Sequence, residues 1–167
     1  MRSPIYLRHP ALGDQREFLA SVRSSRSLHH PWTSAPSTPA QYRGYVERMA
    51  QPGNHAFLIC KRDTGDIVGV INITNTILGL FRSGYLGYYV FAHHERKGLM
   101  RAGLQAVVRH AFKLLKLHRL EANIQPGNAA SIALVKSCGF SLEGCSPRYL
   151  KIGGRWRDHE RWAILAS

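Results

Sequence analysis

Residues 85–101 read YLGYYVFAHHERKGLMR and predict a strand, a glycine turn and the start of a helix. Aromatic and β-branched residues from Tyr85 to Phe91 favour a strand, and apolar residues recur at helical spacing from Leu104 to Leu115. The first N–H groups of a helix have no partner within it and lie at the positive end of its dipole, so they bind anions. Gly98 lets the chain approach a ligand, although a glycine is equally compatible with a simple turn.

The chain before this stretch is predicted to contain a short strand, two helices and a hairpin. Thr38, Pro39 and Gln41 provide an N-cap, a proline at the first helical position and a capping-box partner. Residues 63–66 form a turn-favouring cluster between two strands. The expected elements are a strand at Ile5–His9, a helix from Asp14 to about Ser25, a loop at Ser27–Pro36, a helix from Thr38 to about Ala50, and strands at Ala56–Lys61 and Ile67–Thr74.

The chain after this stretch is predicted to add a strand, a helix and a final hairpin. The strand is Leu120–Ile124 and the helix is Ala129–Ser137. From Phe140 onward two more strands are expected, joined near Gly153 and Gly154. This order predicts an α/β fold, with a mixed sheet and helices on its faces, as one domain over residues 1–167.

The composition is strongly basic, with 23 Lys and Arg against 10 Asp and Glu and a formal net charge of +13. Anionic partners are expected, whether nucleic acid, a ribosome surface or a phosphate-rich cofactor, although a basic surface can also serve solubility alone. No apolar run is long enough for a membrane span or a signal peptide, so a cytoplasmic protein without membrane contact is expected. The three cysteines and nine histidines show no metal-binding spacing, and we expect no metal.

Three segments together carry a resemblance to a known superfamily. Tyr85–Phe91, Glu95–Met100 and Asn128–Phe140, followed by Glu143 and Gly144, resemble the acetyl-CoA signature of the GNAT N-acetyltransferases. More narrowly, residues 85–88, 97–100 and 149–159 are similar to those of the bacterial ribosomal-protein alanine N-acetyltransferases. The resemblance covers most of the chain. It implies a GNAT fold with a mixed central sheet of about six to seven strands flanked by four helices, and acetyl-CoA as cosubstrate.

The resemblance also implies which residues contact acetyl-CoA. In the family the turn holds the pyrophosphate, and the strand before it offers backbone groups to the pantetheine arm. The residues that inherit these contacts are Tyr88, Tyr89, Val90, Arg96, Lys97, Gly98, Leu99, Met100, Arg101, Asn128 and Ser131. Where the family usually begins the turn with Gln or Arg, this chain has Glu95. A carboxylate there repels phosphate unless it points away or pairs with Arg96 or Lys97, but the backbone donors remain.

Direct acetyl transfer needs a neutral amine and a group that accepts its proton. An α-amine, with a pKa near 7.7–8.0, is roughly 10–15% neutral at pH 7, whereas a lysine is about 0.04% neutral. Glu121 lies among apolar neighbours in its predicted strand, where desolvation would make it a useful base. The resemblance implies the same role for it, commonly through water. The alternative is that Glu121 faces solvent or pairs with one of the many basic residues.

Two hydroxyl groups compete for the contact with the leaving thiolate. Ser131 lies three residues after Asn128 at the start of a helix, so both side chains can face one ligand, although helix capping explains them equally well. Tyr149 is the other candidate. Some relatives have a tyrosine at the position of Val135, which donates no proton, and this favours Ser131.

The acceptor is expected to enter between the first helices and the central strands, as the resemblance implies. The loop from His29 to Trp32 is placed to form one wall there, although Trp32 is also compatible with a core position. Asp158 and His159 resemble the final-strand motif of the family, and an ion pair or a hydrogen bond explains them as well.

The leading hypothesis is acetylation of the N-terminal α-amine of a protein, with a ribosomal protein as the acceptor and weak electrostatic contact with RNA or the ribosome. One alternative is a GNAT enzyme that acetylates a small amine or an amino acid. Another is a ribosome- or RNA-binding protein whose acetyltransferase site has decayed.

Overall fold

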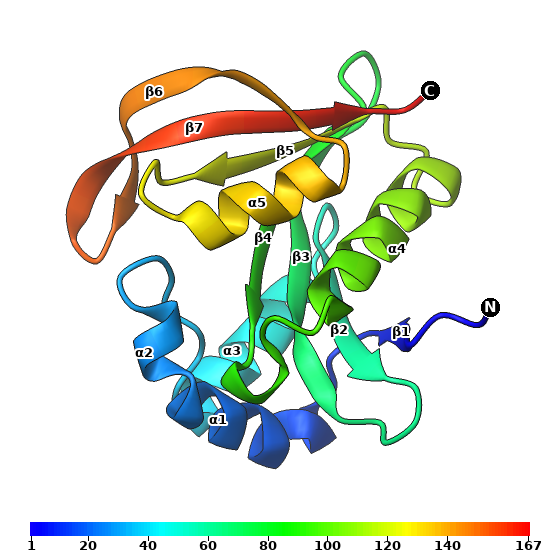
Figure 1. Cartoon of the computed structure of the whole chain (residues 1–167), viewed down its shortest axis with the longest axis vertical. Helices are drawn as coiled ribbons and strands as arrows, with labels where there is room; N and C mark the ends of the chain where they lie inside the picture. The colour runs from blue at the N-terminus through cyan, green and yellow to red at the C-terminus, as the bar shows by residue number, and fades with distance from the viewer.

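The computed structural model describes all residues, 1–167, as a seven-stranded sheet with helices on both faces (Figure 1). The strands are β1 Ile5–Arg8, β2 His55–Lys61, β3 Ile67–Ile77, β4 Ser83–Val90, β5 Arg119–Ile124, β6 Ser141–Ile152 and β7 Arg155–Leu165. The α-helices are α1 Gln15–Ser24, α2 Arg26–His29, α3 Pro39–Met49, α4 Leu99–Lys113 and α5 Ala129–Ser137. Short 3-10 helices lie at Leu12–Asp14 and Ala92–His94. No helix is both long enough and apolar enough to cross a membrane.

The strand order is β1-β2-β3-β4-β5-β7-β6, and only β4 and β5 run parallel to each other. Parallel neighbours need a crossover connection, which α4 supplies between β4 and β5. The final hairpin inserts β7 beside β5, so β6 forms the far edge of the sheet. Figure 1 shows α4 and α5 on one face of this sheet and α1 with α3 on the other.

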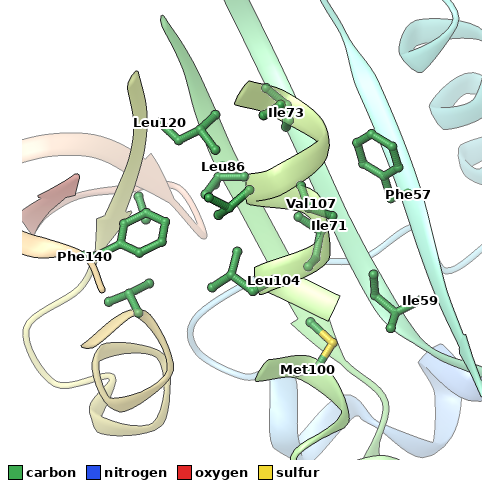
Figure 2. Packing of buried hydrophobic residues seen from close by; sticks show 14 of the residues in the cluster. Phe57, Ile59, Ile71, Ile73, Leu86, Met100, Leu104, Val107, Leu120 and Phe140 are labelled. Atoms are coloured by element: carbon green, nitrogen blue, oxygen red, sulfur yellow. The ribbon is translucent and has the colours of Figure 1, made fainter. Parts of the chain in front are cut away.

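Alternating side chains divide the core between the two faces of the sheet. In β2, Phe57 and Ile59 pack with α4, whereas Leu58 and Cys60 pack with α1 and α3. Figure 2 shows the α4 side, where Leu104 and other apolar side chains of the helix lie against β2, β3 and β4. Leu104 is fully buried, and truncating such a side chain to alanine costs about 2–5 kcal/mol of stability.

The predicted mixed α/β fold is confirmed, and its differences from expectation are local. Thr38 caps α3 by accepting a hydrogen bond from the Gln41 backbone, as expected. The Gln41 side chain, however, accepts from the Ser37 backbone rather than from Thr38. The expected loop at Ser27–Pro36 was wrong in part, because it contains most of α2 and raises the number of α-helices to five. Contacts with β4, which is distant in sequence, hold α2 in place.

Candidate active site

Strands β4 and β5 pair at one end and separate at the other. Residues 83–86 of β4 pair with residues 119–122 of β5, and the pairing stops there although both strands continue. β5 keeps its partner β7 along its whole length, so β4 is the strand that diverges. A cavity of about 710 Å³ lies at this separation. Its walls come from α2, β3, β4, β5, α5 and the final hairpin.

The free edge of β4 offers backbone hydrogen-bonding groups to this cavity. The Phe91 N–H donates to Val68 of β3, so strand alternation turns the backbone groups of Val90 and Tyr88 away from β3 and toward the gap. The Val90 carbonyl already accepts a hydrogen bond from Nε2 of His29 at 2.8 Å. Burial lowers the pKa of His29, which keeps its ring neutral with the hydrogen on Nε2.

The turn before α4 leaves a row of unpaired backbone donors. Gly98 is the N-cap of α4 and has φ 72° and ψ 0°, the left-handed conformation in which glycine avoids steric strain. The first backbone bond of the helix runs from Ala102 to Gly98, so the N–H groups of Leu99, Met100 and Arg101 have no acceptor in the chain. The side chains of Leu99 and Met100 are buried in the core. These two residues therefore face an anion with their backbone only.

Tyr88 and Ser131 form a hydroxyl pair that connects β4 to α5 across the cavity. Their oxygens lie 2.6 Å apart. Burial raises the pKa of Tyr88 to about 12, so the phenol keeps its proton at neutral pH and can donate it to Ser131. The hydroxyl hydrogen of Ser131 is then free for a third group. Asn128 caps α5 by accepting from the Ser131 backbone N–H, so the capping explanation holds for Asn128 and leaves the Ser131 hydroxyl free for the pair with Tyr88.

Glu121 does not have the apolar surroundings that its neighbours in sequence suggest. Leu120 and Ala122 face the core, so strand alternation turns Glu121 to the opposite face of the sheet. There its carboxylate accepts a hydrogen bond from Nε of Arg119 at 2.8 Å. The same guanidinium also bonds Glu143. Glu121 is not among the residues that line the cavity, and its role as the base stays a prediction.

The other half of the cavity is lined by the first helices and the final hairpin. His29 and Trp32 stand on one side, and Tyr149 and His159 on the other. The rings of Tyr149 and His159 lie 6.4 Å apart, edge to face. On the floor, the amide oxygen of Asn72 accepts a hydrogen bond from the Tyr45 hydroxyl at 2.6 Å. A second substrate can enter this part of the cavity and reach the free edge of β4.

A model of the acetyltransferase (GNAT) domain family matches residues 5–141 of the chain. The ribosomal protein uS5-alanine N-acetyltransferase of Escherichia coli is 40% identical over 152 residues, which cover 90% of this chain and 77% of that protein. The chain belongs to the GNAT acetyltransferase family. This membership confirms the GNAT fold and an N-acetyltransferase that depends on acetyl-CoA.

Two further comparisons concern relatives of this GNAT chain with different names. The structure of Mycobacterium smegmatis RimJ in complex with CoA-disulfide superposes with a TM-score of 0.90 at 27% identity, over 97% of this chain and 82% of that one. The spermidine N(1)-acetyltransferase of Vibrio cholerae is 24% identical over 169 residues, covering all of this chain and 96% of that protein. The family is therefore established, while its relatives differ in the amine that they acetylate.

Some of the predicted site residues of this acetyltransferase line the cavity, and others do not. Those that line the cavity are Tyr88, Tyr89, Val90, Met100, Asn128, Ser131 and Tyr149. Those that do not are Arg96, Lys97, Gly98, Leu99, Arg101 and Glu121. The turn residues nevertheless adjoin the cavity through Met100, and their free N–H groups fit the pyrophosphate of acetyl-CoA. Glu95 is exposed and makes no ion pair, so neither Arg96 nor Lys97 neutralises it.

Several polar residues of the cavity were not among the predicted site residues. Asn72, Asn123 and His159 line it, and the Asn123 amide oxygen and the Tyr89 hydroxyl are buried without a hydrogen-bond partner. Burial also raises the pKa of Tyr89 well above its ordinary value. An unpaired buried polar atom is costly, so these two atoms favour a polar ligand at this wall. Only the alternation of Asn123 with the core residues of β5 signals its orientation in the sequence.

Proposed function

We propose that this enzyme transfers the acetyl group of acetyl-CoA to the N-terminal α-amine of a polypeptide. The observation that carries the proposal is the charge of the cavity. None of its 26 lining residues is Asp, Glu, Lys or Arg, although the chain as a whole carries 33 such residues. Its polar atoms belong instead to amides, hydroxyls, imidazoles and backbone. The acceptor that matches such a cavity carries no charge beyond the reacting amine.

This neutral lining separates the acceptor classes. A polyamine such as spermidine brings several ammonium groups, and burying an unpaired charge is expensive without carboxylates to pair it. A free amino acid brings a carboxylate next to its amine, and no Lys or Arg lines the cavity to pair with it. In a polypeptide the same carboxyl is an amide. A protein N-terminus therefore enters with only its α-amine to deprotonate.

The chain's own residues supply the remaining parts of the reaction. The free N–H groups at the start of α4 bind the pyrophosphate, and the edge of β4 aligns the pantetheine arm. Acetyl-CoA supplies the activated acetyl group as a thioester. The Ser131 hydroxyl, hydrogen-bonded to Tyr88, is the proposed proton donor to the leaving sulfur. Binding both substrates along one cavity converts their encounter into a reaction between neighbours.

A basic arm beside the cavity supports an acceptor that is bound to RNA, such as a ribosomal protein. The arm is the hairpin of β6 and β7, where Tyr149, Leu150 and Ile152 line the cavity. Its exposed cations are Arg148, Lys151, Arg155 and Arg157, and its exposed aromatic residues are Tyr149 and Trp156. Cations release counterions when they contact phosphates, and aromatic rings stack on unpaired bases. The arm can thus hold RNA while an adjacent N-terminus enters the cavity.

The acceptor class is tested with four amines, of which three share the α-amine of alanine and the fourth is a polyamine. An Ala-initiated peptide, alaninamide, free alanine and spermidine are each incubated with acetyl-CoA, and kcat/KM is measured from thiol release with mass analysis of the product. We expect the peptide to react fastest, alaninamide more slowly, and free alanine and spermidine at least tenfold more slowly than alaninamide. Faster reaction of spermidine or free alanine than of the peptide would refute the proposal. Acetyl-CoA binding without turnover of any amine would instead favour a decayed site.

The arm is tested with two variants of equal net charge. One replaces Arg148, Lys151 and Arg155 with glutamine, and the control replaces the exposed Arg16, Arg23 and Arg43 of α1 and α3. Fluorescence anisotropy measures binding to a single-stranded RNA at several salt concentrations. Removing three phosphate contacts lowers the slope of log K against log salt by about 2. An equal loss in both variants would mean that net charge, rather than the arm, binds RNA.

A further inference from the structure

His159 presents one ring nitrogen to the cavity in the form that accepts a proton. The residue lies on β7, is 3% exposed and lines the cavity. Its Nδ1 lies 2.8 Å from the backbone carbonyl oxygen of Arg157. Because a carbonyl oxygen only accepts hydrogen bonds, Nδ1 carries the hydrogen of the neutral ring. Nε2 therefore holds the lone pair, and the only side-chain hydrogen bond of His159 is the one made by Nδ1.

The sheet aims His159 at the same wall as the unpaired amide of Asn123. Arg161 of β7 pairs with Asn123 of β5, and residues two apart on a strand share a face, so His159 and Asn123 face the same side. The titratable groups that share the cavity or this face are Tyr149 on β6, Tyr85, Tyr88 and Tyr89 on β4, His29 on α2, Arg119 and Glu121 on β5 and, on β7, Arg157 and Arg161. No carboxylate lines the cavity, so no acidic group there occupies Nε2.

The contrast with Glu121 decides which group takes the proton. The Glu121 carboxylate is paired with Arg119 and does not line the cavity, whereas His159 lines it with a free lone pair. We propose that His159, through Nε2, is the general base that removes a proton from the acceptor amine. This proposal rests on the proposed function for the kind of amine, but it applies to any amine that the enzyme acetylates.

The proton and electron balance of the step is complete without another reactant. His159 Nε2 accepts one proton from the bound ammonium group. The neutral nitrogen then attacks the thioester carbonyl carbon, so that a C–N bond forms and the C–S bond breaks with its electron pair on sulfur. The second proton of the nitrogen passes to this thiolate, directly or through the Ser131 hydroxyl. His159 returns its proton to water, and the products are the amide, the thiol and one proton.

The experiment separates the two nitrogens of the ring with two substitutions. In His159→Asn, the amide nitrogen can still donate to the Arg157 carbonyl, but nothing remains at the position of Nε2. In His159→Gln, the longer side chain fills that position with a group that does not titrate. Both variants are assayed with the amine that the wild-type enzyme uses best, and acetyl-CoA binding and thermal unfolding are measured to check that each variant is folded.

The expected result is a loss of at least 100-fold in kcat/KM at pH 7 in both variants, with acetyl-CoA affinity kept. On the acid side of the pH profile the amine and its base must both be unprotonated in the wild type, so log kcat/KM rises with a slope near two per pH unit. In each His159 variant this slope falls to about one, because only the amine titrates.

Two matched variants complete the test. His110→Gln replaces a half-buried histidine that lies outside the cavity, with its ring 5.0 Å from that of Phe57, and should keep the slope of two. Glu121→Gln should keep it as well, because ordinary carboxylates are already ionised in this range. The proposal is overturned if His159→Asn keeps the wild-type rate and slope, or if only Glu121→Gln removes the pH dependence. A change of preferred amine alone would count against the proposed acceptor and leave this test intact.

Discussion

Replacing Gly98 with alanine tests whether the turn before α4 binds the pyrophosphate. Gly98 has φ 72°, and an added Cβ would meet no protein atom within 4 Å. The substitution therefore adds backbone strain of about 1–2 kcal/mol, partly offset by the lower entropy of alanine in the unfolded chain. A net loss of about 1 kcal/mol lowers Tm by about 2–4 °C in a chain of this size. We also expect the methyl group to hinder the approach of a phosphate to the free N–H groups.

The larger effect is expected on acetyl-CoA. Losing one hydrogen bond to a charged group costs about 1.5–3 kcal/mol, which raises Kd roughly 10- to 150-fold. Isothermal titration calorimetry with acetyl-CoA measures this change directly. Acetyl-pantetheine, which has no pyrophosphate, should bind the wild type and Gly98→Ala equally, because the edge of β4 is unchanged.

Gly79→Ala is the matched control for this experiment. Gly79 has φ 70°, and an added Cβ there also meets nothing within 4 Å. The residue lies in the loop that connects β3 to β4 and does not line the cavity. It should show the same fall in Tm with an unchanged Kd for acetyl-CoA. Equal loss of affinity in both variants, or wild-type affinity in Gly98→Ala, would refute the role of the turn.

Three further predictions concern single side chains. Glu95→Gln should lower the Kd for acetyl-CoA about two- to fivefold at low salt and less at high salt, because the exposed carboxylate has no ion pair. An unchanged Kd at low salt would show that the Glu95 side chain points away from the phosphates. Ser131→Ala and Tyr88→Phe should each lower kcat about tenfold. Because the two hydroxyls act as one pair, the double variant should be no slower than either single variant, and additive losses would contradict this. The pKa of His29 is lowered by burial from 6.5, so the unfolded chain binds more protons than the folded chain just below pH 6.5, and stability must fall as the pH drops through this range. His29→Gln, which keeps a donor for the Val90 carbonyl, should therefore flatten part of the fall in Tm between pH 6.5 and pH 5, and an unchanged curve would exclude His29 as a source of it.

The sequence predicted the fold and the glycine turn before α4 because both depend on local patterns. Strand and helix periodicity, the Thr38 cap and the position of Gly98 are each set within a few residues, and the structure has them where the pattern indicated. A pyrophosphate site made of backbone groups needs only that local order. The pairing of β4 with β5 ends at Leu86 and Ala122 while β5 stays paired with β7, and no local pattern reveals this.

The acceptor half depends on contacts between residues that are far apart in the sequence. His29 bonds the Val90 carbonyl across 61 positions, and Tyr45 bonds Asn72 across 27. The prediction that Glu121 has apolar surroundings was wrong for a related reason. Its apolar neighbours in sequence lie on the opposite face of the strand, and its carboxylate bonds Arg119 instead. Adjacent residues share one environment in a fully buried strand, but they lie in different environments in a strand with two different faces.

The charged residues of the chain lie outside the cavity, so the surface and the cavity can bind different kinds of ligand. A net charge of +13 predicts a polyanionic partner, yet no Lys or Arg lines the cavity. The basic residues therefore cannot select the acceptor amine, and they would repel a cationic one as it approaches. They can act only on anions outside the cavity, which are the phosphates of acetyl-CoA and any nucleic acid near the β6–β7 arm. If the acceptor is, as proposed, a protein N-terminus carried on RNA, the RNA attracts the basic surface of the enzyme and the uncharged cavity binds the N-terminus.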